Sequence, residues 1–250
     1  MMSVCWIVGL STTGLHGAAW DALEDWKCNY LEDGYLQHID KAEVDLVVEL
    51  GSYLGLDAVL MHKYYNCPVY TFECDQERAE DVERNTKPYP AVKFVPYGAW
   101  NETKIMTFYH SNFPGSSSFF QHDVESKARK ERISVEEVIN KYNLRMNPQT
   151  VQAIRLDEWI EKEQIGRIDL LCVDVQGAAL RVFQGLGECL AEIKYIITEV
   201  DYDDQYVGQS FYHEINDFLT TNGFVCCPSK GCVDLLYINT RKDLWKGISN

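Results

Sequence analysis

Residues 44–55 read VDLVVELGSYLG, and this stretch decides the fold class. The run before the first glycine is apolar and rich in β-branched residues, which is typical of a strand buried on both faces of a parallel sheet. Gly51 and Gly55 then bound a tight turn, and residues 56–65 are predicted to form a helix. The stretch therefore predicts the strand–turn–helix unit from which open α/β sheets are built.

The same alternation continues along the chain. Further strands are predicted at 68–72, 92–97, 168–173, 193–200, 224–227 and 233–238, and helices at 76–85, 156–163, 178–186 and 211–220. A strand–helix–strand succession predicts a parallel sheet with right-handed crossovers. The last two strands are separated only by a Ser-Lys-Gly turn at 229–231, so they are expected to form a hairpin.

Two segments depart from this rhythm. Residues 1–42 are expected to form an N-terminal cover over the main domain, which spans 43–250. Residues 98–150 form a long insertion, and such insertions in compact α/β domains often act as substrate lids. Within it a short strand is expected at 105–109. A helix at 134–142 begins with the Ser-x-x-Glu pattern of a capping box.

Composition excludes several classes of protein. The net charge of −15 and the sequence pI near 4.8 disfavour a nucleic-acid partner, which needs clustered Lys and Arg. The 9 cysteines form no CxxC pair and no zinc-ligand spacing, which favours reduced thiols and a cytoplasmic location. Because no apolar run approaches about 20 residues, no membrane helix is expected.

Two features point to a nucleoside cofactor. The glycine turn has G-x-x-x-G spacing, so it is neither the dinucleotide fingerprint nor a phosphate-binding loop with its Lys. It follows a strand, where open α/β folds bind ligands. Glu73 ends the second predicted strand, where a carboxylate can accept hydrogen bonds from both ribose hydroxyls. A solvated acid at a strand end is the alternative.

Asp174 ends another apolar strand, inside the sequence LCVDVQGA of residues 171–178. A carboxylate there could orient a cofactor, bind a metal or accept a proton, and it could also cap the next helix. An acidic group follows the fifth strand, formed by Glu199, Asp201, Asp203 and Asp204. Together with Asp174 it could hold a divalent cation, but a solvated acidic loop is the expectation.

Three ordered stretches resemble the FkbM-type methyltransferases. They are RLDEW at 155–159, IDLLCVDVQG at 168–177 and VFQGL at 182–186, and Phe72-Glu73, Ser116-Ser117-Ser118 and Glu199 match as well. The resemblance covers roughly residues 44–226. It implies a Rossmann-like class I methyltransferase with a seven-stranded, mostly parallel sheet and an antiparallel last strand. It also implies S-adenosylmethionine-dependent O-methylation of a hydroxyl on a sugar or another small natural product.

The resemblance and the motifs together give a set of site residues. The expected cofactor-binding residues are Glu49, Gly51, Ser52, Tyr53, Gly55, Glu73, Cys74, Gly98, Ala99 and Asp174. The expected catalytic residues are Asp174, Gln176 and Glu199, and no metal ligand is assigned.

Two of these residues depart from the family pattern. Tyr53 stands where the family has Asn, and Gln176 stands where it has Glu. Because a Gln side chain carries no charge and cannot act as a base, the alternative is a non-catalytic binding module that retains the cofactor pocket. A nicotinamide-dependent oxidoreductase is less favoured, because its fingerprint is missing.

Overall fold

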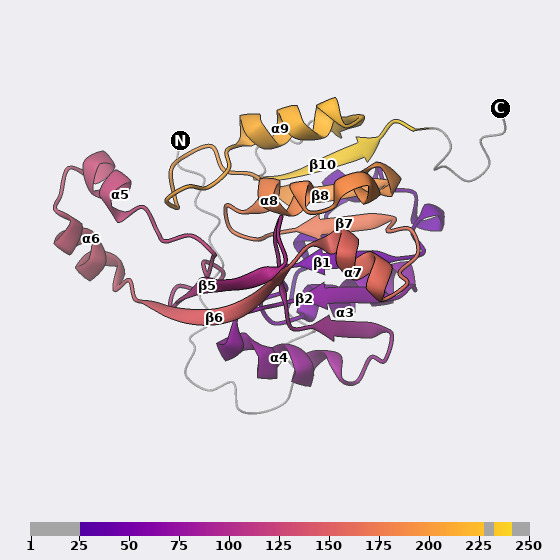
Figure 1. Cartoon of the computed structure of the whole chain (residues 1–250), viewed down its shortest axis with the longest axis horizontal. Coiled ribbons are helices and arrows are strands. Elements are labelled where there is room, and N and C mark those ends of the chain that lie inside the picture. Colours follow the sequence, from indigo (N-terminus) through magenta and orange to yellow (C-terminus); the bar gives the residue numbers. More distant parts are fainter. Residues whose placement is uncertain (1–25, 228–232, 242–250) are drawn as a thin grey trace.

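A seven-stranded sheet forms the centre of the protein (Figure 1); the computed structural model describes residues 26–227 and 233–241. Its strand order is β3-β2-β1-β7-β8-β10-β9. The strands are β1 (Val47–Leu50), β2 (Val69–Phe72), β3 (Val92–Val95), β7 (Leu170–Val173), β8 (Tyr195–Glu199), β9 (Phe224–Cys227) and β10 (Asp234–Asn239). β10 pairs antiparallel with β8 and β9, and every other pair in this sheet is parallel. The predicted mostly parallel sheet with an antiparallel last strand is confirmed.

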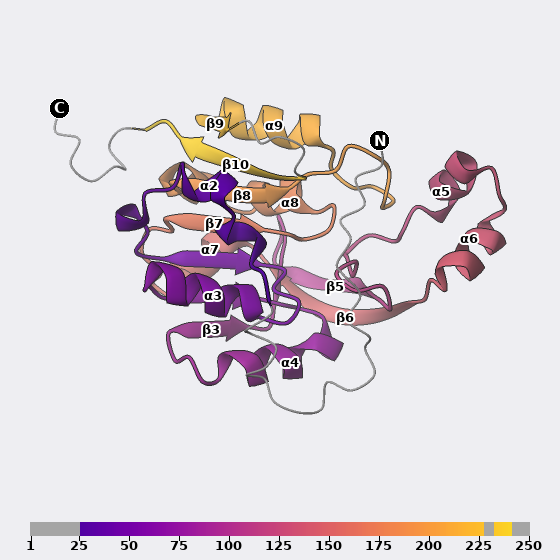
Figure 2. The ribbon, with the colours of Figure 1, turned by 180° about the vertical axis from the view of Figure 1, so that it is seen from behind.

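Helices cover both faces of this sheet. They are α3 (Leu56–Tyr65), α4 (Gln76–Thr86), α7 (Leu156–Lys162), α8 (Ala179–Gln184) and α9 (Tyr212–Thr221). α7, α8 and α9 bury their apolar side chains in one core, which is on the near side in Figure 1. α3 packs in a second core on the opposite face, which is on the near side in Figure 2. The β1 strand is fully buried between these layers, as its apolar run predicts.

Residues 26–43 pack beside α3 in the second core. They contain three short helices, η1 (Asn29–Leu31), α2 (Asp33–Leu36) and η2 (Lys41–Glu43). Tyr30, Tyr35 and Ile39 are buried there. Residues 1–25 of the expected N-terminal cover lie outside the described residues, so the cover remains a prediction.

The insertion builds a second sheet in the order β4-β6-β5. Its elements are β4 (Gly98–Ala99), β5 (Lys104–Ser111), α5 (Val124–Glu131), α6 (Val135–Tyr142) and β6 (Met146–Ile154). The strand expected at 105–109 is longer than predicted, and its partner β6 was missed. The first half of β6 is mostly exposed and polar, so it lacks an apolar pattern. The capping box of α6, between Ser134 and Glu137, is confirmed.

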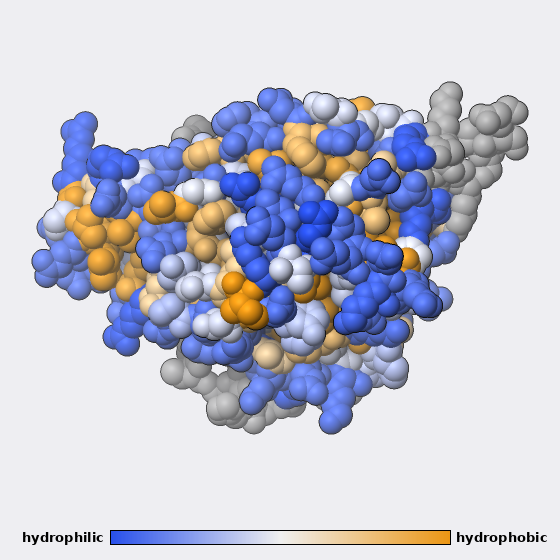
Figure 3. Space-filling model, viewed as in Figure 1, coloured by the Kyte–Doolittle hydropathy of each residue, from blue (hydrophilic) through white to orange (hydrophobic). Residues whose placement is uncertain are grey.

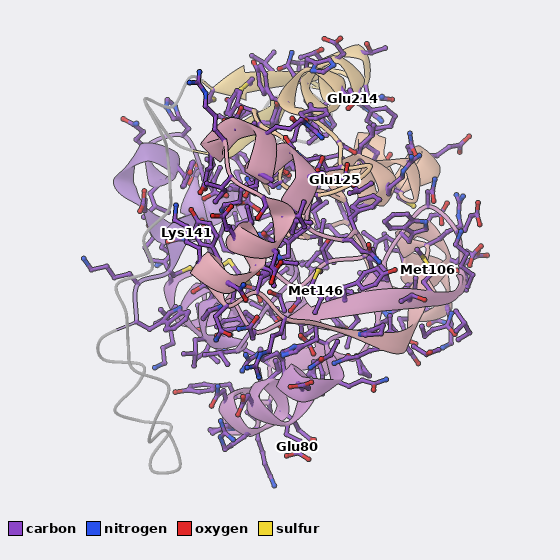
Figure 4. All side chains as sticks on the ribbon, turned by 90° about the vertical axis from the view of Figure 1, so that its left-hand side faces the viewer. Glu80, Met106, Glu125, Lys141, Met146 and Glu214 are labelled. Carbon is purple, nitrogen blue, oxygen red and sulfur yellow. The ribbon has the colours of Figure 1, made fainter. Side chains whose placement is uncertain are left out.

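α5 and α6 form an arm that projects beyond the main sheet (Figure 1). Figure 4 shows Glu125 of α5 and Lys141 of α6 in front of the sheet, between Glu214 of α9 and Glu80 of α4. Apolar side chains gather on the surface of this arm in Figure 3. Val135 and Ile139 of α6 contribute to this exposed apolar surface, being 36% and 40% exposed. The insertion begins just after the carboxyl end of β3, so it lies at the edge of the sheet where open α/β folds bind ligands.

Candidate active site

An open pocket lies at the carboxyl ends of β1, β2, β3 and β7. It encloses about 650 Å³, counting the part that is open to solvent. The main sheet contributes the turn after β1, the end of β2, the segment after β3 and the loop after β7. The insertion closes one side. The lining residues used below are Gly51, Tyr53, Glu73, Cys74, Arg78, Gly98, Ala99, Phe108, Phe119, Asp174 and Gln176.

The glycine turn fits closely against the β7 loop. Gly51 has a φ of +86°, and an ideal Cβ at this position would lie 1.8 Å from the carbonyl oxygen of Asp174. Tyr53 also has a left-handed φ, of +52°. Asn tolerates this backbone region better than Tyr does, which gives the departure from the family pattern a physical cost. The Tyr53 ring stacks under the guanidinium of Arg78, whose Cζ lies 4.8 Å from the ring centroid.

Glu73 is fixed by backbone donors at the end of β2. Its Oε2 accepts from the Tyr53 N–H at 2.9 Å, and its Oε1 accepts from the Asp75 N–H at 2.8 Å. Burial raises the pKa of Glu73 to about 7. A carboxylate can accept about four hydrogen bonds, so Glu73 can still accept from a ligand hydroxyl beside its backbone donors.

Three predicted cofactor-binding residues lie behind the pocket wall. Glu49 is 1% exposed, and its Oε2 accepts from Thr71 Oγ1 at 2.5 Å. Burial, followed by the nearby Asp57 carboxylate, raises the pKa of Glu49 to about 8. Ser52 is buried, and its hydroxyl has no hydrogen-bond partner within the described residues. Gly55 is the left-handed N-cap of α3. These residues shape the turn and its electrostatics without lining the pocket.

The three predicted catalytic residues are in direct contact. The Gln176 Nε2 atom donates to Asp174 Oδ1 at 2.5 Å and to Glu199 Oε2 at 2.7 Å. Burial raises the pKa of Asp174, and it raises the pKa of Glu199 well above its ordinary value. The charge of the Asp174 carboxylate contributes to the shift at Glu199. The carboxamide therefore bridges two buried carboxyl groups that disfavour simultaneous ionisation.

Sequence reasoning missed the residues that hold Gln176 in place. Tyr206, in the loop after β8, donates from its hydroxyl to Gln176 Oε1 at 2.7 Å. Ser118 Oγ, in the insertion, donates to the main-chain carbonyl of Gln176 at 2.6 Å. The Ser116-Ser117-Ser118 match was a signal for Ser118. Tyr206 lies in a polar loop without periodicity and gave none.

An aromatic wall from the insertion was also missed. Phe119 packs so closely on Gly98 that an ideal Cβ there would lie 2.4 Å from its ring. The Phe119 ring lies 5.2 Å from that of Trp100 and 5.3 Å from that of Phe108, measured between centroids. Such a wall beside Glu73 suits a flat heterocycle joined to a ribose.

The electrostatics of the pocket favour a cationic ligand. Arg78 is the one basic side chain among the described residues that line it, and it stands over Tyr53. The acids in and behind the wall have raised pKa values, because burial penalises their charged forms. A positive charge placed here would relieve this penalty.

The acidic residues after β8 do not converge on a cation site. Asp203 and Asp204 instead face Lys130 of α5, with oxygen–nitrogen distances of 3.6 and 3.7 Å. Across residues 26–227 and 233–241, no three His, Cys, Asp or Glu side chains are grouped to hold a metal ion. No helix in the same ranges has the length and apolar character needed to cross a bilayer.

A class I methyltransferase fold is defined by the order of the strands, by the antiparallel strand β10 and by the position of the pocket at the carboxyl ends of the parallel strands. Residues 55–226, more than half of the chain, match the Methyltransferase FkbM domain. The chain therefore belongs to the FkbM methyltransferase family and is a methyltransferase, which confirms the resemblance seen in its motifs.

Two relatives illustrate this membership. The chain is 25% identical over 198 residues to the 2-O-methyltransferase NoeI of Sinorhizobium fredii (strain NBRC 101917 / NGR234), covering 78% of this chain and 80% of NoeI. Its fold superposes on the crystal structure of Methyltransferase FkbM from Methylobacillus flagellatus KT with a TM-score of 0.51. That alignment has 10% identity and covers 82% of this chain and 46% of the other, so it supports the fold alone.

Proposed function

We propose that the protein transfers a methyl group from S-adenosylmethionine to a hydroxyl of a saccharide or another small natural product. One observation carries the proposal: a single pocket is lined both by the anchored Glu73 carboxylate and by Asp174 and Gln176, whose amide also contacts Glu199. The first suits a ribose diol and the second a cationic centre. An oxygen acceptor is supported by the relative NoeI, a 2-O-methyltransferase.

The pocket residues fit this cofactor in charge and shape. Glu73 would accept from the ribose hydroxyls, and Phe119 and Cys74 would contact the adenine. Asp174 would hold the amino-acid part. S-adenosylmethionine, when bound, supplies a methyl group on a positively charged sulfur. The carboxylates in this wall attract that positive charge and lower its energy. Arg78 is the one basic side chain among the described lining residues, so little positive charge in the pocket opposes this effect.

The acidic pair, Asp174 and Glu199, would orient the acceptor and receive its proton. As the new carbon–oxygen bond forms and the carbon–sulfur bond breaks, the hydroxyl proton must leave. A carboxylate with a raised pKa is a better base than an ordinary one. Either Asp174 or Glu199 qualifies on this ground. The insertion, which lines the pocket with Phe108 and Phe119 and contacts Gln176 through Ser118, would supply the acceptor-binding surface and act as a lid.

Calorimetry with S-adenosylhomocysteine tests the proposal without an acceptor. We expect binding to the wild type and none of comparable strength for NAD. Glu73→Gln should weaken binding by roughly tenfold or more, the scale of a lost charge-assisted hydrogen bond. Glu80→Gln, on the exposed face of α4, is the matched control and should bind as the wild type does. Absence of S-adenosylhomocysteine binding, or preference for NAD, would overturn the proposal.

The non-catalytic alternative rested on Gln176 and gains no support from its contacts. The carboxamide is engaged at both ends with the predicted catalytic residues and Tyr206. A Glu at the same position would place a third carboxyl group against two buried ones. The substitution is thus compatible with an intact site.

A further inference from the structure

We propose that Tyr206 is a positioning residue for methyl transfer: its hydroxyl fixes the orientation of the Gln176 carboxamide, so that the amide nitrogen faces Asp174 and Glu199. This inference rests on the proposed function of the pocket. It assigns a role to a residue of the loop after β8 that contacts Gln176. The supporting geometry is a chain of hydrogen bonds that runs from Tyr206 through the amide of Gln176 to Asp174 and Glu199.

An amide group has two chemically different ends, and the surroundings of Gln176 distinguish them. The nitrogen end has two N–H groups, and two carboxyl oxygens lie within 2.5 and 2.7 Å of Nε2. The oxygen end can only accept, and the Tyr206 hydroxyl lies 2.7 Å from Oε1. A rotated amide would direct Oε1 at the two carboxyl oxygens and the NH₂ group at the Tyr206 hydroxyl, which could then accept one N–H only while donating to the Ser116 carbonyl at 3.3 Å. Only the observed orientation therefore gives both N–H groups a carboxyl acceptor and leaves the Tyr206 hydroxyl to donate to Oε1.

Tyr206 is held rigidly enough to impose this orientation. It is 3% exposed, and its ring stacks on that of His122 with centroids 4.9 Å apart. The Tyr206 N–H donates to Gln209 Oε1 at 2.6 Å. An ideal Cβ at Gly177 would lie 3.3 Å from Tyr206 Cδ2, so the ring also packs against the glycine that follows Gln176. The loop after β8 thus presents a fixed hydroxyl to a buried amide.

The orientation matters because acidic groups surround the carboxyl pair. The titratable groups around the pair are Tyr30 of η1, Glu49 of β1, Asp57 of α3, Asp201 and Tyr206 of the loop after β8 and Asp234 of β10, with His122 behind Tyr206. None of these described groups supplies a cation to the pair; burial lowers the pKa of His122 to about 4, which keeps it neutral. Asp174 and Glu199 already disfavour simultaneous ionisation, and if the amide turned they would also lose the two N–H donors that stabilise their charged forms. The pair would then carry less negative charge towards the pocket.

Tyr206→Phe tests the inference, because it removes the hydroxyl and retains the ring. The first measurement is a ¹³C NMR titration of the Asp174 and Glu199 carboxyl groups in the ligand-free protein. We expect the midpoint of the pair to rise by about half a pH unit or more in the variant, the effect of a lost donor. The second measurement compares S-adenosylmethionine with S-adenosylhomocysteine by calorimetry at about pH 7.5. S-adenosylmethionine, whose sulfonium adds a positive charge, should weaken by roughly three- to tenfold, and S-adenosylhomocysteine, which shares the amino-acid part but lacks this charge, by a clearly smaller factor.

Two further variants separate positioning from a general loss of packing. Tyr237→Phe is the matched control, since its buried hydroxyl also donates to a side-chain amide oxygen, Asn216 Oδ1 at 3.3 Å, away from the pocket. It should leave both measurements unchanged. In a Gln176→Ala background, Tyr206→Phe should add no further shift, because its effect passes through the amide. An unchanged carboxyl midpoint in Tyr206→Phe, or a shift that persists without Gln176, would overturn the inference. Failure of the wild type to bind either ligand would instead overturn the proposed function, and the NMR titration would still decide the role of Tyr206.

Discussion

The α-carbon of Gly51 lies so close to the main chain of Asp174 that an ideal Cβ would be 1.8 Å from the Asp174 carbonyl oxygen. This contact joins the turn after β1 to the loop after β7. The turn that holds Glu73 through the Tyr53 N–H therefore abuts the loop that carries Asp174. Any side chain at position 51 would separate the cofactor turn from the acidic pair.

Gly51→Ala should destabilise the protein by at least about 2–4 kcal/mol, because the left-handed backbone and the collision with Asp174 both penalise a methyl group. Chemical denaturation measures this loss. Gly166→Ala is the control: Gly166 is exposed, and no other described group lies within 4 Å of its ideal Cβ. Equal stability of the two variants would contradict the tight contact.

The unliganded protein should lose stability as pH rises from about 5 to 8. Burial raises the pKa of Glu49 to about 8 and that of Glu73 to about 7, from an ordinary value of 4.5. Between these values the unfolded chain releases protons that the folded protein keeps. Each group therefore lowers the folding equilibrium constant by up to about tenfold per pH unit. The contribution is complete below pH 4.5 and is lost as pH passes the folded pKa.

Denaturation midpoints at several pH values measure this dependence. Glu49→Gln removes one titrating group and retains an oxygen that can accept from Thr71 Oγ1. Its stability should fall less steeply with pH than that of the wild type. A wild-type stability that is constant or increases over this range would contradict the predicted sign.

Gln176→Glu should be tolerated better at about pH 5 than at about pH 8. The new carboxyl group would lie against Asp174 and Glu199, and a third ionised carboxylate at such distances is strongly repelled. At the lower pH a proton can replace the lost amide N–H. Thermal unfolding at both pH values checks this, and Gln121→Glu, at an exposed position of the insertion, is the control. A variant that matches the wild type at the higher pH would show that the site accommodates the residue usual in the family.

Asp75→Ala should destabilise the protein more than Asp123→Ala, although both residues cap a helix. Asp75 accepts from the Glu77 N–H at the start of α4, and it also contacts buried His110 of β5 and Gln149 of β6. Asp123 accepts from the Ser126 N–H at the start of α5. Loss of a cap costs about 1 kcal/mol, and buried groups left without a partner add about 1–3 kcal/mol. Urea denaturation of both variants measures the difference, and equal losses would contradict it.

The sequence by itself determined the main sheet and the lining residues of the pocket that follow its strands. Apolar runs such as 44–50 identify strands because burial on both faces leaves a local pattern that does not depend on the rest of the chain. Parallel strands then bring their carboxyl ends to one edge. For that reason Gly51, Glu73 and Asp174 could be assigned to one site before any contact was known.

Only the tertiary structure decided what closes the pocket and what orients its chemistry. Phe119 and Tyr206 reach the site from loops whose paths depend on distant packing, and no periodicity marks them. The contact between Ser118 and Gln176 spans 58 residues. Glu49 was predicted to bind the cofactor, but the packing of its side chain against Thr71 of β2 places it behind the pocket wall. Local sequence patterns record burial, whereas contacts between loops are set by the assembled fold.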